Sequence, residues 1–93
     1  MTVLSSTLSR TVTIVNELGL HARSAAKIAK LAQEAQSGVW IKMAEEAADA
    51  TSILDILTFA CGKGAQITVV VDDPIDRTVL ERIVKLVESG FGE

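Results

Sequence analysis

The strongest constraint on the fold is the alternation of strand-forming and helix-forming segments along a chain of 93 residues. β-Branched residues in alternating runs predict strands, whereas apolar residues spaced three and four positions apart predict helices. Strands are expected at residues 11–15, 39–43, 47–51 and 65–71, of which the third is a weak edge strand. Helices are expected at residues 22–36, 52–60 and 74–89. The predicted order is therefore β-α-β-β-α-β-α.

The ends of the predicted helices carry residues that start and stop helices. Ser52 is placed to cap the second helix, with Asp55 as its capping-box partner. Asp73 and Pro74 are placed as the cap and the first residue of the third helix, and Gly90 as its terminator.

These elements predict a single α+β domain. Strands and helices each show one apolar face, so a sheet covered on one face by helices is the simplest packing. The other face of the sheet should be open to solvent, with Trp40 partly exposed on it. The polar residues expected there are Thr11, Thr13, Lys42 and Thr68. Residues 1–8 are expected to form a loose arm before a domain at residues 9–93.

Composition excludes several classes of function. A net charge of −3 without a basic run argues against nucleic-acid binding, and an aromatic content of 3% argues against base stacking. The sequence shows neither a signal-peptide pattern nor an apolar run of membrane-spanning length, which predicts a soluble cytoplasmic protein. One histidine and one cysteine are too few ligands for a zinc site. Cys61 is expected to be a small buried apolar residue.

The single histidine, His21, directly precedes the helix predicted to begin at Ala22. The free backbone N–H groups of a first helical turn favour an anion and disfavour a protonated imidazole, which leaves a ring nitrogen able to react. Arg23 can pair with phosphate oxygens in the same space, and Gly19 allows the loop to turn tightly. These residues indicate a site where a phosphoryl group is attached to His21. The alternative is a helix cap or an ordinary surface histidine.

Two segments resemble the HPr family, the histidine-containing phosphocarrier proteins of the bacterial phosphotransferase system. The first is NELGLHARSAAKIAKLA, residues 16–32, which matches the pattern Gly-Leu/Ile-His-Ala/Thr-Arg-Pro-Ala except at Ser24. The second is TSILDILTFACGKGAQITV, residues 51–69, and the closing ESGFGE is similar to some family tails. Both segments lie at the family spacing, so the resemblance covers about residues 9–93.

The resemblance implies an HPr-like open-faced β-sandwich, in which a four-stranded antiparallel sheet lies under three helices. The last strand would lie between the first two, which would then run parallel to each other. No cofactor is implied, and we expect a monomer.

The resemblance also implies that His21 accepts a phosphoryl group on its δ1 nitrogen from enzyme I, itself charged by phosphoenolpyruvate. His21 would pass the group to a histidine of an enzyme IIA domain, for sugar uptake. Arg23 and the backbone amides of Ala22 and Arg23 would bind the phosphate. Such a protein is a phosphoryl-transfer intermediate, often classed with the transferases, rather than a stand-alone catalyst. The candidate docking residues for the partners are Lys27, Lys30, Ile53, Leu54 and Leu57.

The departures of the chain from the family pattern include Ser24 and Thr51. Ser24 replaces a proline that restricts the first helical turn, and it adds an N–H and a hydroxyl that are candidates for binding phosphate. Thr51 replaces the lysine that often precedes the family's regulatory serine, while Ser52 itself is kept. Ser52 is therefore either a target of an HPr kinase/phosphorylase or a helix cap only.

Two rival functions stay open at the level of sequence. The first is a nitrogen-type paralogue that relays phosphate for regulation without sugar transport. The second, of a different class, is an α/β interaction module that uses no phosphate, in which His21 and Arg23 are incidental.

Overall fold

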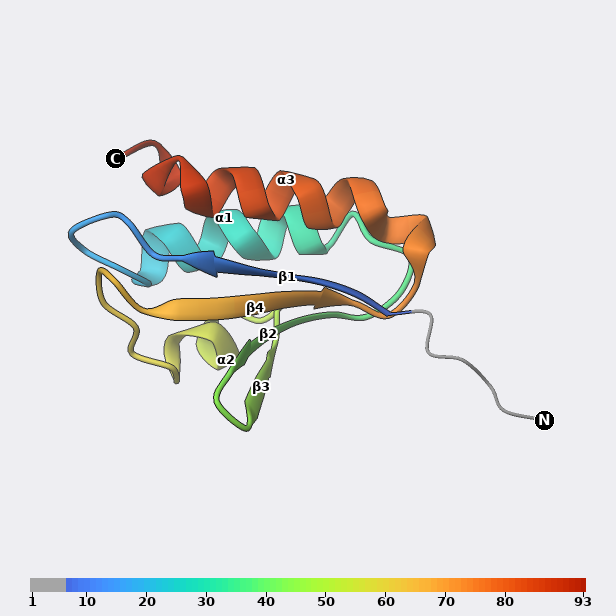
Figure 1. The fold of residues 1–93 in the computed structure, drawn as a ribbon, viewed down its shortest axis with the longest axis horizontal. Helices are drawn as coiled ribbons and strands as arrows, with labels where there is room; N and C mark the ends of the chain where they lie inside the picture. The colour runs from blue at the N-terminus through green and yellow to red at the C-terminus, as the bar shows by residue number, and fades with distance from the viewer. Residues whose placement is uncertain (1–6) are drawn as a thin grey trace.

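The computed structural model describes residues 7–93, which fold into one β-sheet with helices packed against it (Figure 1). The elements are β1 (Leu8–Thr13), α1 (Ala22–Ala32), β2 (Val39–Met43), β3 (Glu46–Asp49), α2 (Ile53–Leu57), β4 (Gln66–Val71) and α3 (Arg77–Glu88). Short 3₁₀ turns occur at Pro74–Asp76 and Gly90–Gly92. The predicted order of elements is confirmed. Of the expected arm, residues 1–6 lie outside the described residues, and Leu8 already belongs to β1.

The four strands form one antiparallel sheet in the order β1-β4-β2-β3. β4 pairs with β1 on one side and with β2 on the other, so β1 and β2 run parallel to each other without pairing directly. The register places Val12 opposite Ile67 and Ile41 opposite Val69. This is the topology that the family resemblance implied, and it is confirmed.

The helices cover one face of the sheet, where α1 packs against both α2 and α3 (Figure 1). Apolar side chains from both layers meet there and are at most 1% exposed, among them Ile28, Ile41, Ile56, Ile67 and Ile83. Burial of each such side chain contributes about 1.5–3 kcal/mol relative to exposure. The opposite face is open: Thr11 shares a hydrogen bond of 2.9 Å with Thr68 across β1 and β4.

The first helix ends at Ala32, four residues earlier than expected. The carboxylate of Asp76, only 3% exposed, accepts hydrogen bonds from the backbone N–H groups of Gln36 and Ser37, both at 2.8 Å. It also accepts one from the Ser37 hydroxyl at 2.5 Å. These hydrogen bonds turn the chain toward β2. They also hold the pKa of the Asp76 carboxyl below its usual value.

The second and third helices also differ slightly from expectation. α3 begins at Arg77, after a 3₁₀ turn in which Asp73 caps the N–H of Ile75 at 2.9 Å. Ser52 caps α2 by accepting from Asp55 at 3.2 Å, but the expected capping box is only half formed. The N–H of Ser52 is already donated to the carbonyl of Asp49, so the Asp55 carboxylate instead accepts from the N–H of Asp49 at 3.4 Å.

Among residues 7–93, none of the helices combines the length and the apolar character that a membrane span requires. The same part of the chain holds no cluster of three or more side chains suited to a metal ion. Cys61 is buried, as expected, and burial raises the pKa of its thiol.

Candidate functional site

His21 is the N-cap residue of α1, at the junction between the loop after β1 and the helix. Its backbone is extended (φ −133°, ψ 179°), and its Nδ1 accepts a hydrogen bond from the backbone N–H of Arg23 at 3.3 Å. The ring is therefore attached to the start of the helix through Nδ1. Since the first-turn N–H groups of a helix lack partners within it, an anion on Nδ1 would lie beside those donors.

Ser24 fixes the backbone of this junction from inside. Its hydroxyl accepts the backbone N–H of His21 at 2.9 Å, and it lies 3.1 Å from the carbonyls of Gly19 and His21, to either of which it can donate. The side chain is fully buried. The structure thus commits the Ser24 hydroxyl to the loop rather than to a bound phosphate.

The loop before His21 lies directly on the segment that follows α2. Gly19 has a φ of 65°, and a Cβ atom at that position would lie 2.2 Å from the carbonyl oxygen of Cys61. The next residue, Leu20, donates its N–H to the same carbonyl at 2.9 Å. Only glycine combines this positive φ with so close an approach, so Gly19 holds the loop in place.

The other edge of the imidazole meets a residue that we did not expect. Nε2 of His21 lies 2.5 Å from Oε2 of Glu93, and Oε1 of Glu93 accepts from Nδ2 of Asn16 at 3.0 Å. The hydrogen bonds from Asn16 and His21 lower the pKa of the Glu93 carboxyl, with the positive charge of Lys27 acting in the same direction. Glu93 is 72 positions from His21, and no local sequence signal links them.

Arg23 is exposed at the second position of α1. Among residues 7–93, no carboxylate holds its guanidinium group, so it is able to reach an anion beside His21.

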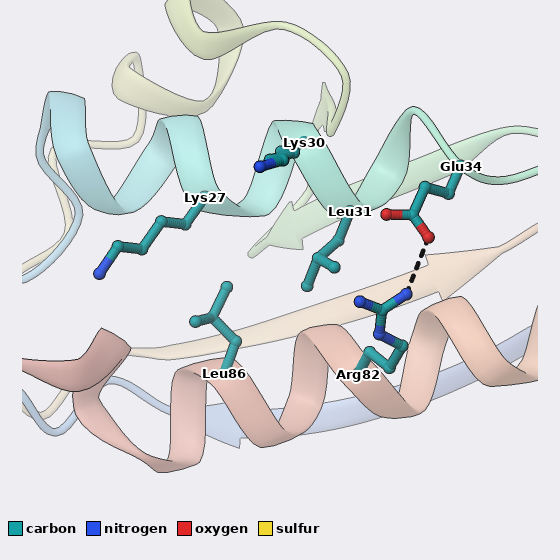
Figure 2. A pocket seen from close by; sticks show the side chains of 6 residues that line it. All are labelled: Lys27, Lys30, Leu31, Glu34, Arg82 and Leu86. Carbon is teal, nitrogen blue, oxygen red and sulfur yellow. Dashed lines mark hydrogen bonds and ion pairs between the residues drawn. The ribbon is translucent and has the colours of Figure 1, made fainter.

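The expected docking lysines have different surroundings. Lys30 is exposed, whereas Nζ of Lys27 donates to the carbonyl of Phe91 at 2.6 Å. Both lysines line an open groove of about 260 Å³ between α1 and α3 (Figure 2). Leu31 and Leu86 also line this groove, whose far end holds the ion pair of Arg82 and Glu34 at 2.8 Å. His21 is not part of the groove.

An apolar surface lies on α2, the helix that packs beside α1. Leu54 is 78% exposed and Ile53 39% exposed, whereas Leu57 is half-buried and Ile56 takes the core position. Of the three apolar residues predicted for docking, Ile53 and Leu54 are therefore on the surface, whereas Leu57 packs partly against the core.

Several known proteins are similar to this chain in sequence and in fold. The family profile described as "PTS HPr component phosphorylation site" matches residues 8–89. The Phosphocarrier protein HPr of Cupriavidus necator is 36% identical over 86 residues, covering 92% of this chain and 97% of that protein. The Phosphocarrier protein NPr of Shewanella violacea is 41% identical over 86 residues, covering 92% and 94%.

The chain belongs to the HPr family. The solved structures that it resembles include HPr of Thermoanaerobacter tengcongensis, with a TM-score of 0.83, 30% identity, and coverage of 92% of this chain and 97% of that one. HPr of Bacillus anthracis gives a TM-score of 0.81 at 26% identity, with coverage of 88% and 98%. The HPr fold and the general role of a phosphocarrier in the phosphotransferase system therefore apply to this chain.

Proposed function

We propose that His21 carries the phosphoryl group on Nδ1, receiving it from an enzyme I and passing it to a histidine of an enzyme IIA domain. The observation that carries this proposal is the contact between Nδ1 and the N–H of Arg23 at 3.3 Å. It puts the lone pair of Nδ1 at the start of α1, where the free donors of the helix are gathered.

The transfer itself needs positioning more than chemical force, because the phosphoryl group passes between two nitrogens. The lone pair of Nδ1 attacks phosphorus, the P–N bond of the donor breaks, and its electron pair returns to the donor nitrogen. The N–H of Arg23 exchanges Nδ1 for a phosphoryl oxygen, and the Arg23 guanidinium approaches from solvent. In the second transfer the Nδ1–P bond breaks in the same way.

The test is incubation with enzyme I and phosphoenolpyruvate, followed by intact mass measurement before and after mild acid. We expect the wild-type protein to gain one acid-labile phosphate. His21→Asn keeps a side-chain oxygen that can cap α1, so it should fold but gain nothing. Phosphate on the His21→Asn protein would contradict the assignment, and an unmodified wild type with an active enzyme I would contradict the function.

The final acceptor is assigned by the same assay extended to IIA domains. Sugar uptake is the first candidate, in line with the HPr relative of Cupriavidus necator. The 41% identity to an NPr protein favours a second candidate, a nitrogen-type relay used for regulation. Transfer rates from the phosphorylated protein to a sugar-type and to a nitrogen-type IIA domain, measured side by side, distinguish them.

The protein would act in the cytoplasm. Its single cysteine cannot form an internal disulfide, which is consistent with a reducing compartment.

A further inference from the structure

The two contacts of the His21 ring select the same tautomer. A backbone N–H can only donate, so the bond from Arg23 requires a lone pair on Nδ1. The proton of the neutral ring then resides on Nε2, which lies 2.5 Å from the Glu93 carboxylate. A carboxylate can only accept, so the second contact requires the same Nε2–H proton. Nδ1, the nitrogen beside the helix start, is thereby left as the nucleophile.

Glu93 is itself held in place from three sides. Asn16 is 6% exposed, and its Nδ2 donates both to Glu93 and to the carbonyl of Gly19, each at 3.0 Å. Phe91, two residues before Glu93, is 1% exposed, and Lys27 binds its carbonyl at 2.6 Å. The carboxylate is therefore held by Asn16 of the active-site loop, and the chain segment just before it by α1 and by the core.

We propose that Glu93 is a positioning residue for phosphoryl transfer, which holds His21 as the Nε2–H tautomer and offsets the charge of the phosphorylated ring. Asn16 orients Glu93 in this role. The inference rests on the proposed function, since it assigns a role to a neighbour of the same histidine. It follows the general pattern in which a carboxylate orients a histidine through the nitrogen that does not react.

The charge balance of the step explains why a carboxylate suits this position. When the lone pair of Nδ1 forms a bond to phosphorus and Nε2 keeps its proton, the ring becomes cationic. The Glu93 carboxylate lies next to the Nε2–H group that shares this positive charge. When the Nδ1–P bond breaks, the electron pair returns to Nδ1 and the ring is neutral again. The proton stays on Nε2 in both steps, so no separate base is needed.

The test uses phosphoramidate, a small phosphoryl donor that needs no enzyme I. The wild type, Glu93→Ala, Glu93→Gln and the control Glu88→Gln are compared by the rate of phosphohistidine formation and by nitrogen-15 NMR of the His21 ring. Glu88 is exposed, and its replacement makes the same change in charge as Glu93→Gln. Thermal melting of each variant confirms that it is folded.

We expect Glu93→Ala to accept phosphate about 10-fold more slowly and to lose the Nε2–H signal that the bond to Glu93 should give the wild type. Glu93→Gln keeps an acceptor oxygen, so it should keep the signal but still be slowed. Glu88→Gln should match the wild type in both measurements. The proposal is overturned if Glu93→Ala is folded and unchanged in rate and in the Nε2–H signal. Because phosphoramidate acts without enzyme I, a failure with every enzyme I would count against the proposed function and not against this role of Glu93.

Discussion

The hydroxyl of Ser24 lies 2.9 Å from the backbone nitrogen of His21 and accepts its hydrogen bond in a fully buried position. The same oxygen lies 3.1 Å from the carbonyl of Gly19. A proline at this position would restrict the first helical turn through its ring. Here the serine joins the loop to the helix by hydrogen bonds, so the backbone around the histidine is fixed by another means.

Ser24→Ala should lower the free energy of unfolding by about 1–2 kcal/mol, because it leaves the partly buried N–H of His21 without its acceptor. Urea unfolding measures this. Ala26→Ser, at a half-buried position of the same helix, is the control for a single hydroxyl change in α1 and should lie much closer to the wild type. Equal stability of Ser24→Ala and the wild type would show that the loop does not depend on this hydrogen bond.

Arg23→Ala should slow phosphoryl transfer from enzyme I without abolishing it. The guanidinium offers a planar pair of donors to phosphate oxygens, but the backbone donors at the start of α1 remain in the variant. Rates in both directions with purified enzyme I provide the measurement. Arg77→Ala removes another exposed arginine, at the start of α3, and should have little effect. Unchanged rates for Arg23→Ala in both directions would remove Arg23 from the site.

A structural feature of this protein can be predicted from the sequence when the residues that determine it are close together in the sequence. The order of elements and the helix start behind His21 follow from neighbouring residues, and the strand order followed from the family resemblance. The contact between His21 and Glu93 does not, because it joins residues 72 positions apart in the sequence. The end of α1 was misplaced for the same reason, since it depends on Asp76, 40 positions beyond Gln36. Tertiary contacts of this kind override local periodicity.

Asp76→Ala should lower the free energy of unfolding by about 2 kcal/mol at neutral pH, because Gln36 and Ser37 lose a charged acceptor. The hydrogen bonds lower the pKa of Asp76 in the folded state. Its contribution to stability is therefore present above the unfolded pKa of about 4 and is lost as the pH falls through the folded value.

The stability difference between the wild type and Asp76→Ala should accordingly narrow as the pH falls below about 4. Urea unfolding at a series of pH values tests this. Glu45→Ala, in the exposed turn between β2 and β3, should differ little from the wild type throughout. A difference for Asp76→Ala that stays constant down to low pH would mean that the charge of Asp76 contributes nothing.

Regulation at Ser52, which the family resemblance implies, would connect the cap of α2 with the docking of enzyme I. Ser52 accepts the N–H of Asp55, so a negative charge at residue 52 would lie at the positive end of α2. It would also lie beside Ile53 and Leu54, the exposed apolar residues of the proposed docking face. An enzyme I surface that is acidic enough to meet Lys27 and Lys30 would be repelled by that charge.

Ser52→Asp should therefore fold with a free energy of unfolding within about 1 kcal/mol of the wild type, since the new charge meets favourable helix donors as well as the nearby Asp55. It should accept phosphate from enzyme I about 10-fold more slowly or worse, whereas its rate with phosphoramidate should stay unchanged, because only protein docking is affected. Thr78→Asp adds the same charge to the exposed first turn of α3 and serves as the control. Equal enzyme I rates for Ser52→Asp and Thr78→Asp would exclude α2 from the docking face, and a large loss of stability would show instead that residue 52 must remain an uncharged cap.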